Sequence, residues 1–317
     1  MDLRGRTQGV MTTGGNPVVC GIAITHPEKL LWPATKGAKA VSKLDLARYY
    51  EAAAERILAH VADRPISIVR APDGIDGERF FQRHKLMGAS APLLSIRVRG
   101  EAQPFLGIDN TKSLVALAQA GVLEIHPWGS KRGEPDVPER IILDLDPAPD
   151  VAFDRVIEAA RELRDRLVVL GLVPFVKTTG GKGLHVVVAV EGRPKKPPSW
   201  PETKAFARAV AASMAADDPE RYTMTVSKRA RTGKIFVDYL RNDRTSTGVA
   251  PWSPRARPGA TIAVPLNWSQ LKRGLDRQTF TIGSSAQLLR RPDPWADLAA
   301  SARSLESAMR KLGAPKR

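Results

Sequence analysis

The chain is poor in cysteine and has no long apolar run. Cys20 is its only cysteine, which excludes an intramolecular disulfide and a zinc site built from several thiolates of one chain. No apolar run approaches the roughly 20 residues that a membrane-spanning helix needs. The first residues also lack the apolar stretch of a secretory signal. We therefore expect a protein of the reducing cytosol, with no membrane partner and a flexible N-terminal leader over residues 1–21.

Acidic residues are too few to balance the basic ones. The sequence has 33 Asp and Glu against 49 Lys and Arg, which gives a formal charge of +16 and a pI near 10.3. A polyanion is the natural partner of such a chain. Nucleic acid is favoured over an anionic membrane, because the basic residues are scattered and do not form one amphipathic helix. A basic surface that serves only solubility is the alternative.

Apolar periodicity predicts helices and strands in mixed order. The predicted helices cover 42–61, 111–120, 153–170, 203–216 and 295–312, and the predicted strands cover 64–70, 122–126, 140–146, 174–178, 184–190 and 234–240. Residues 72–84 are interpreted as a turn-rich surface connection. The order favours an α+β (mixed α/β) fold, with strands 140–146 and 234–240 in one central sheet.

Two predicted strands carry carboxylates. Asp144 and Asp146 are two residues apart, so their side chains leave one face of the strand and can share divalent cations. Asp238 is the third candidate, because an acid in the apolar run KIFVDYL is costly to bury without a cation or partner. The alternatives are strand-end caps or ion-pair partners. A D-x-D pair also occurs in aspartyl phosphatases and metal-dependent sugar transferases, but Ala148 disfavours the phosphatase version, and the basic surface favours two-metal phosphoryl transfer.

A glycine-rich loop and several basic residues could surround these carboxylates. The loop TTGGKG, residues 178–183, lies between two predicted strands, where backbone amides and Lys182 can approach an anion. An ordinary hairpin turn is the alternative. His126 and His185, at strand ends, are interpreted as phosphate or sugar contacts or as core histidines. Phosphate or template contacts are expected from the arginines that flank Asp238 in sequence, namely Arg231, Arg241, Arg244 and Arg255.

The motifs HPWG, ILDLDP, TTGGKGLHVVV, FVDYLRN and SPRARPGA occur in this order, preceded by HPEKLLWPAT, SKLDLARYY and RFFQRH. This set resembles the polymerase domain of bacterial ATP-dependent DNA ligase D, in the archaeo-eukaryotic primase superfamily. The resemblance covers residues 22–317. It implies a primase-like core with central, mostly antiparallel sheets flanked by helices, DNA-end-binding segments in about 22–120 and a catalytic core in about 121–290.

The resemblance also implies a function. The chain would add nucleotides, preferably ribonucleotides, to primer ends or gaps in double-strand break repair by end joining, with template direction and two Mn²⁺ (or Mg²⁺) ions. Its substrates would be nucleoside triphosphates and DNA ends or gaps with a 5′-phosphate, in the nucleoid, with Ku and a DNA ligase as further partners. Two other functions stay open: a non-catalytic DNA-end-binding module and a primer-independent primase.

By the same resemblance, Asp144, Asp146 and Asp238 hold the metal ions. The nucleotide-binding residues are His126, Thr179, Gly180, Gly181, Lys182, Gly183, His185, Arg241 and Arg255. The DNA-binding residues are Lys29 and Lys43 at the 5′-phosphate, Phe80 and Phe81 near template bases, and Lys228 and Arg231. Lys39 is the alternative to Lys43, because the segment between Lys29 and Lys43 looks longer than usual. No K-x-D-G motif occurs, so ligase chemistry is not expected from this polypeptide.

Overall fold

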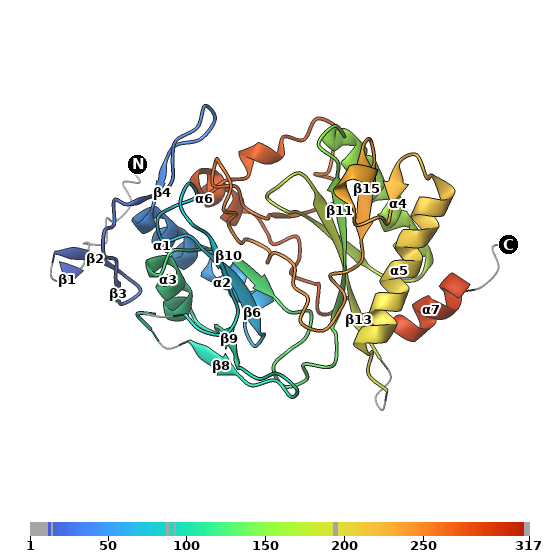
Figure 1. The fold of residues 1–317 in the computed structure, drawn as a ribbon, viewed down its shortest axis with the longest axis horizontal. Coiled ribbons are helices and arrows are strands. Elements are labelled where there is room, and N and C mark those ends of the chain that lie inside the picture. Colours follow the sequence, from blue (N-terminus) through green and yellow to red (C-terminus); the bar gives the residue numbers. More distant parts are fainter. Residues whose placement is uncertain (1–11, 14, 87–88, 92, 193–195, 314–317) are drawn as a thin grey trace, which may run out of the picture.

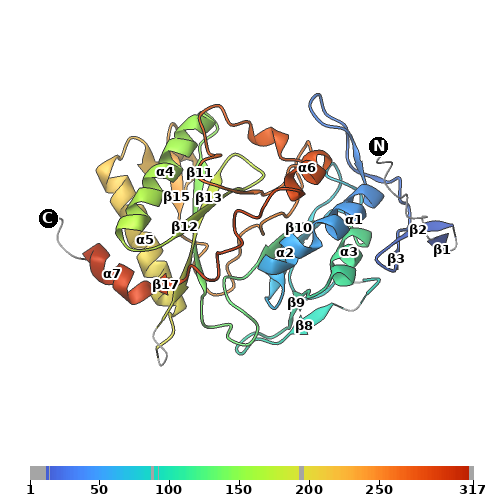
Figure 2. The ribbon, with the colours of Figure 1, turned by 180° about the vertical axis from the view of Figure 1, so that it is seen from behind.

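Two β-sheets, each covered by helices, organise the chain (Figure 1). The computed structural model describes residues 12–13, 15–86, 89–91, 93–192 and 196–313. Residues 12–23 and residues 305–313 lie at opposite ends of the molecule, as the view from behind also shows (Figure 2). No helix of the described residues is long and apolar enough to cross a membrane.

The N-terminal half contains the smaller of the two main sheets. Its strand order is β10-β6-β9-β8, with β7 paired to β6, and helices α1, α2 and α3 lie beside it (Figure 1). The strands are β6 (Ile66–Arg70), β7 (Phe80–Gln82), β8 (Leu94–Ile96), β9 (Phe105–Gly107) and β10 (Val122–Pro127), and the helices are α1 (Lys43–Ala52), α2 (Ala54–Val61) and α3 (Thr111–Gln119). Short strands precede them: β1 (Thr12–Thr13), β2 (Asn16–Val19), β3 (Ile22–Ala23), β4 (Leu30–Trp32) and β5 (Val41–Ser42).

The C-terminal half is built on a larger, mostly antiparallel sheet of order β14-β15-β11-β13-β12-β16, with β17 parallel to β13. Its strands are β11 (Arg140–Pro147), β12 (Pro174–Thr178), β13 (Leu184–Glu191), β14 (Tyr222–Thr223), β15 (Ile235–Asp238), β16 (Pro265–Leu266) and β17 (Arg303–Ser304). The helices are α4 (Phe153–Val169), α5 (Trp200–Asp217), α6 (Ser285–Leu289) and α7 (Leu305–Gly313). Three 3-10 turns are η1 (Lys228–Arg231), η2 (Arg277–Thr279) and η3 (Ile282–Ser284).

The two faces of the larger sheet differ in chemistry because side chains alternate along β11. Ile141, Leu143 and Leu145 are buried in the main core, and β11 contacts both α4 and α5. The intervening residues, which include Asp144 and Asp146, lie on the opposite face. The carboxylates are therefore on the face that the helices α4 and α5 leave uncovered.

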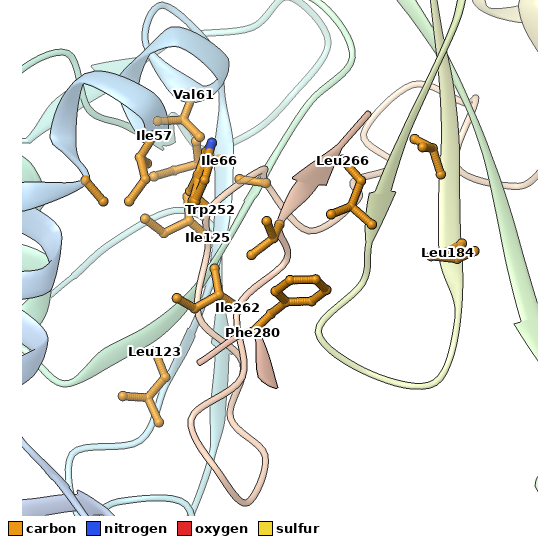
Figure 3. Close-up of a cluster of buried hydrophobic side chains, with 14 of the residues drawn as sticks. Ile57, Val61, Ile66, Leu123, Ile125, Leu184, Trp252, Ile262, Leu266 and Phe280 are labelled. Carbon is orange, nitrogen blue, oxygen red and sulfur yellow. The ribbon is translucent and has the colours of Figure 1, made fainter. Parts of the chain in front are cut away.

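A long segment after β15 joins the two halves. Trp252, Ile262 and Phe280 of this segment are buried between the N-terminal sheet with α2 and the strands of the larger sheet (Figure 3). The backbone N–H groups of Ala250 and Thr178 complete the connection, because they donate to the carbonyls of Ile125 and Val264 at 2.9 and 3.0 Å. One apolar core thus continues through both halves.

The predicted fold class and the pairing of the two acidic strands are confirmed, but several element predictions were wrong. The helix predicted over 42–61 is two helices, separated at Ala53. The connection 72–84 contains strand β7. The helix predicted over 203–216 begins earlier, at Trp200, because Ser199 and Glu202 form a capping box.

The helix predicted over 295–312 was also wrong, since α7 begins only at Leu305. Trp295 and Leu298 instead pack on Val187 and Ala189 of the larger sheet, and the Trp295 indole donates to the Val176 carbonyl at 3.1 Å. These tertiary contacts override the helical pattern. At the other end, β2 pairs with β3, so the fold begins before Ile22, and residues 1–11 of the expected leader lie outside the described residues.

Candidate active site

One cross-strand row on the open face of the larger sheet holds four ionisable residues. Asp144 of β11 lies opposite Asp238 of β15 and opposite His185 of β13, and His185 lies opposite Lys177 of β12. Directly opposed residues of antiparallel strands point to the same face. The strand register therefore brings together two of the predicted metal ligands and a predicted nucleotide contact, and Asp146 follows on the same face.

Basic side chains neutralise the three carboxylates. Arg241 lies 3.0 Å from Asp238 and 3.8 Å from Asp144. Lys182 and Arg231 lie 3.3 and 3.1 Å from the two oxygens of Asp146. Three carboxylates on two neighbouring strands repel each other, and these cations offset that repulsion. Each carboxylate thus has a cationic partner within 4 Å.

The pKa values of the two opposed carboxylates move in opposite directions. Burial raises the pKa of Asp238, which the nearby charge of Asp144 raises further and Arg241 only partly offsets. Burial alone would also raise the pKa of Asp144, but His185 and Arg241 lower it below its usual value. Two acids whose surroundings separate their pKa values are typical of a functional site.

The glycine-rich loop between β12 and β13 is fixed through its carbonyl groups. Thr261 donates to the carbonyl of Gly180 at 2.6 Å, and Arg277 donates to that of Gly181 at 2.8 Å. The Thr179 hydroxyl accepts from the amide of Gly181 and donates to the carbonyl of Gly183. Thr179, predicted as a nucleotide contact, therefore uses its hydroxyl to close the loop.

Two glycines of this loop cannot be replaced without strain. Gly180 has φ +65°, and a Cβ there would lie 2.5 Å from Arg255. A Cβ on Gly183 would lie 2.4 Å from the Leu145 carbonyl oxygen, in the strand that carries the carboxylates. Gly183 thus allows the loop to approach β11 closely.

We expect Gly183→Ala to destabilise the protein by about 1–3 kcal/mol, since backbone must move to admit the methyl group, and to reduce activity by displacing the strand beside Asp144. Gly181→Ala is the matched control, because its Cβ would meet its nearest atom, the Thr179 hydroxyl, at an ordinary 3.4 Å. Urea denaturation of both variants measures the difference. Equal free energies of unfolding would contradict the close approach.

A buried glutamate orients two of the predicted nucleotide contacts. Glu124 accepts a hydrogen bond from His126 at 2.8 Å and lies 3.0 Å from the Arg255 guanidinium. Its other oxygen accepts from the amide of Ala256 at 2.8 Å. Burial alone would raise the pKa of Glu124, but these neighbours lower it to about 2. Glu124 is therefore an ionised anchor for His126 and Arg255.

A cavity of about 320 Å³ lies between the carboxylates and the glycine-rich loop. Asp144, Asp146, Lys182 and Arg241 are on its wall, with most of the predicted nucleotide contacts: His126, Thr179, Gly181, Gly183, His185 and Arg255. Asp238 and Gly180 do not line it. Its volume is at the lower end of the range for small-molecule sites, and its lining combines acids, the glycine-rich loop and basic side chains.

Two predicted DNA or phosphate contacts have other roles in the structure. Arg231 is buried: its guanidinium bonds Asp146, donates to the carbonyls of Thr225 and Val226, and lies 3.8 Å from the centre of the Phe236 ring. Arg244 pairs with Glu101 at 2.7 Å and with Asp136 at 2.8 Å, which links loops away from the cavity. Arg231 therefore positions Asp146, and Arg244 is not among the residues that line the cavity, so its predicted contact with phosphate or template stays a prediction.

The remaining predicted DNA contacts lie outside the cavity. Lys228 is exposed in η1, and Phe81 is 57% exposed, with Arg83 5.8 Å from its ring centre. Phe80 is half-buried on β7. An exposed aromatic next to an arginine is suited to stacking on an unpaired base.

Lys29 and Lys43 lie close together, as expected for a phosphate pocket. The backbone of Lys43 bonds the carbonyl of Lys29 at 2.8 Å, and burial together with the charges of Lys29 and Arg70 lowers the pKa of Lys43. Lys39 instead lines a separate groove with Arg48. The geometry favours Lys43 over Lys39 as the partner of Lys29.

Sequence reasoning missed several residues of the site. Glu124 had a signal: it is an acid two residues before His126 in an apolar strand, so both leave the same face. Arg257, which lines the cavity, and Arg277 and Thr261, which hold the loop, come from loops without a pattern of their own. Lys177 is fully buried at the end of the cross-strand row, where the apolar run PFVKT gave no reason to select it.

The chemistry of the carboxylates fits a divalent metal, because oxygen ligands are those that Mg²⁺ and Mn²⁺ prefer. Among the residues that the structure describes, no group of three or more His, Cys, Asp and Glu side chains is arranged to hold a metal ion. The carboxylates instead form ion pairs with Arg241, Arg231 and Lys182. Metal binding would thus require these side chains to shift, or phosphate oxygens of a substrate to complete the ligand set.

A mostly antiparallel sheet with three carboxylates beside a glycine-rich loop, in a strongly basic chain, is the arrangement expected of a domain of the primase-polymerase class. The family model of the LigD primase-polymerase domain matches residues 42–295. The chain belongs to this family.

Known relatives agree with this assignment. The multifunctional non-homologous end joining protein LigD of Pseudomonas aeruginosa is 38% identical over 296 residues, which are 92% of this chain and 34% of that protein. The LigD of Mycobacterium tuberculosis H37Rv is 33% identical over 88% of this chain and 38% of that protein. The chain thus spans about a third of the length of these relatives. The polymerase domain of Mycobacterium tuberculosis ligase D in complex with DNA superposes with a TM-score of 0.78 and 31% identity, over 89% of this chain and 99% of that one.

Proposed function

We propose that the chain is a template-directed nucleotidyltransferase that adds nucleotides, preferably ribonucleotides, to primer ends or gaps in DNA during double-strand break repair by end joining. The observation that carries this proposal is the row of Asp144 opposite Asp238, with Asp146 on the same face, beside the glycine-rich loop. The relatives' names and the DNA in the related structure support the pathway and the substrate.

The chain's own residues would bind and orient the incoming nucleotide. Lys182, within the loop, and Arg255, which bonds the carbonyl of Thr179, supply positive charge for a triphosphate. Glu124 holds His126 and Arg255 in place, so these groups need little reorganisation when a nucleotide binds. Positioning and charge neutralisation of this kind provide most of the acceleration in phosphoryl transfer.

Asp144, Asp146 and Asp238 would hold two Mn²⁺ or Mg²⁺ ions. When bound, such ions activate the primer 3′-hydroxyl and neutralise the triphosphate. Arg241 and Lys182, which now pair with the acids, would be free to contact phosphate instead. This exchange of partners links metal binding to substrate binding.

The test is primer extension on gapped DNA with Mn²⁺, comparing ribonucleotides with deoxyribonucleotides. Metal-dependent incorporation, faster with ribonucleotides, is the expected result. Binding of phosphorylated gapped DNA without nucleotide incorporation in the presence of any metal would favour a non-catalytic end-binding module. Products from template and nucleotides alone would favour a primer-independent primase.

Ku and a DNA ligase are proposed partners, and co-sedimentation with each on DNA ends tests them.

We expect Lys43→Ala to weaken binding to gapped DNA that carries a 5′-phosphate by about tenfold or more, because a charge-assisted contact to phosphate is lost. Binding to the same DNA without the 5′-phosphate should change little. Lys39→Ala is the matched control, since Lys39 lines another groove. Fluorescence anisotropy measures the affinities of the wild type and both variants for the two DNAs, and an equal loss on both DNAs in Lys43→Ala would refute the pocket.

A further inference from the structure

A second cavity lies at the other end of β11 from the carboxylates. It has a volume of about 690 Å³ and is lined by the end of α2, the loop before β11, the end of β13 and residues 293–302. Arg140, on its wall, is four residues from Asp144, or about 13 Å along the strand. Ile142, Val187 and Trp295 pack together in the intervening space. A space of only about 10 Å³, lined by Arg140 on one side and His185 on the other, lies between this cavity and the candidate active site, so the two cavities are distinct.

Two buried arginines face this cavity with little compensation. Arg64 is 5% exposed and Arg140 is 9% exposed. Arg64 pairs with Glu139, and Lys131 competes for the same carboxylate at 3.3 Å. In the part of the chain that the structure describes, Arg140 forms no ion pair within 4 Å and no side-chain hydrogen bond, and the charge of Glu139 raises its pKa only in part. The half-buried Glu139 thus offsets part of the charge of three basic residues, Arg64, Lys131 and Arg140.

Polar nitrogen atoms at the cavity also lack hydrogen-bond partners. Among the described residues, one terminal nitrogen of Arg64 and Nε2 of His60 are buried without a hydrogen-bond partner. His60 is 4% exposed and contacts the Trp295 ring edge-to-face at 5.6 Å. Buried donors are nearly always satisfied in folded proteins, so unpaired ones indicate a missing partner.

The pKa values of Arg140 and His60 also indicate an excess of positive charge at the cavity. Burial and the adjacent charge of Arg64 lower the pKa of Arg140 to about 9. Burial, together with Arg140 and Arg64, lowers the pKa of His60 to about 3, so His60 is neutral and every charge acting on it is positive. The other acid well inside the cavity, Asp293, pairs with Arg56 at 3.0 Å, and Glu191 is exposed at the rim.

We propose that this cavity binds an oxyanion of the phosphate class between Arg64 and Arg140, with His60 beside it. Guanidinium groups bind phosphate oxygens in pairs, and a tetrahedral anion presents oxygens in several directions at once. Its source is inorganic phosphate or the phosphate of a nucleotide, since the apolar wall formed by Trp295, Leu298 and Pro198 leaves room for a larger body. The site does not depend on the proposed polymerase activity.

The test measures thermal unfolding and calorimetric binding with inorganic phosphate and with AMP, in EDTA and at constant ionic strength set with chloride. Arg140→Gln removes the unpaired charge, Arg303→Gln removes an exposed arginine of β17 as a matched control, and Asp144→Asn monitors the separate active site. We expect phosphate to raise the Tm of the wild type, Arg303→Gln and Asp144→Asn by several degrees, and affinity to fall at least about tenfold in Arg140→Gln. Without ligand, Arg140→Gln should melt at or above the wild-type temperature, because a repulsive buried charge is gone.

AMP binding that is tighter than phosphate binding and falls in Arg140→Gln identifies a nucleotide ligand of this cavity, and equal affinities that fall together identify inorganic phosphate. The proposal fails if phosphate stabilises the wild type no more than chloride does, or if Arg140→Gln binds phosphate within twofold of the wild type. It also fails if ligand-free Arg140→Gln melts well below the wild type, since Arg140 would then have a structural role.

Discussion

Replacing Asp144 with asparagine is expected to reduce metal-dependent nucleotide addition by at least about 100-fold, while the protein stays folded. Asp144 lies at the centre of the cross-strand row, opposite both Asp238 and His185. Asparagine has the same shape and still accepts a hydrogen bond from His185, but it lacks the charge that a divalent cation needs. Primer extension under single-turnover conditions measures the loss.

Asp165→Asn is the matched control for this substitution, because Asp165 is an exposed acid of α4 paired only with its neighbour Arg164. Its extension rate should equal that of the wild type. Circular dichroism and gel filtration establish that both variants are folded. An Asp144→Asn variant that extends primers within a few fold of the wild type would remove the carboxylate row from the mechanism.

Glu124→Gln is expected to lower the free energy of unfolding at pH 7 by about 3 kcal/mol and to weaken nucleotide binding. Its surroundings lower the pKa of Glu124 from the usual 4.5 to about 2, and about 1.4 kcal/mol per pKa unit gives roughly this figure. The amide would also leave Arg255 without its counter-ion, and an unpaired buried charge is strongly destabilising.

The contribution of Glu124 to the free energy of unfolding depends on pH, in a direction that follows from its lowered pKa. Because the native pKa is lowered, the contribution of Glu124 is present in full above pH 4.5 and is lost as the pH falls from 4.5 towards 2. The difference in urea stability between the wild type and Glu124→Gln should therefore be constant between pH 6 and 8 and shrink below pH 4.5. A difference that stays constant down to pH 3 would show that Glu124 acts by packing and not by charge.

The metal-binding candidates could be predicted from the sequence, but their arrangement in space could not. The D-x-D spacing on an apolar run places Asp144 and Asp146 on one face through the two-residue period of a strand. Their position opposite Asp238 depends on the register between strands about 90 residues apart in sequence, which no local pattern encodes. The order of the predicted elements favoured one sheet for both strands, and the structure supplies their register.

Other features depended on tertiary contacts that local patterns do not carry. Arg231 reads as an exposed basic residue in SKRARTGK, yet it stacks on Phe236 and holds Asp146. The segment after Trp295 has helical periodicity, yet its apolar side chains cover the larger sheet. In both cases, burial against a distant strand outweighs the local preference.

The most direct test of the metal-binding row is a crystal of the protein with Mn²⁺ and a non-hydrolysable ribonucleoside triphosphate, with data collected at the manganese absorption edge. We predict two anomalous peaks in contact with Asp144, Asp146 and Asp238, with the triphosphate against the loop Thr179–Gly183. Manganese bound elsewhere, or a bound triphosphate with no manganese at these three carboxylates, would contradict the account.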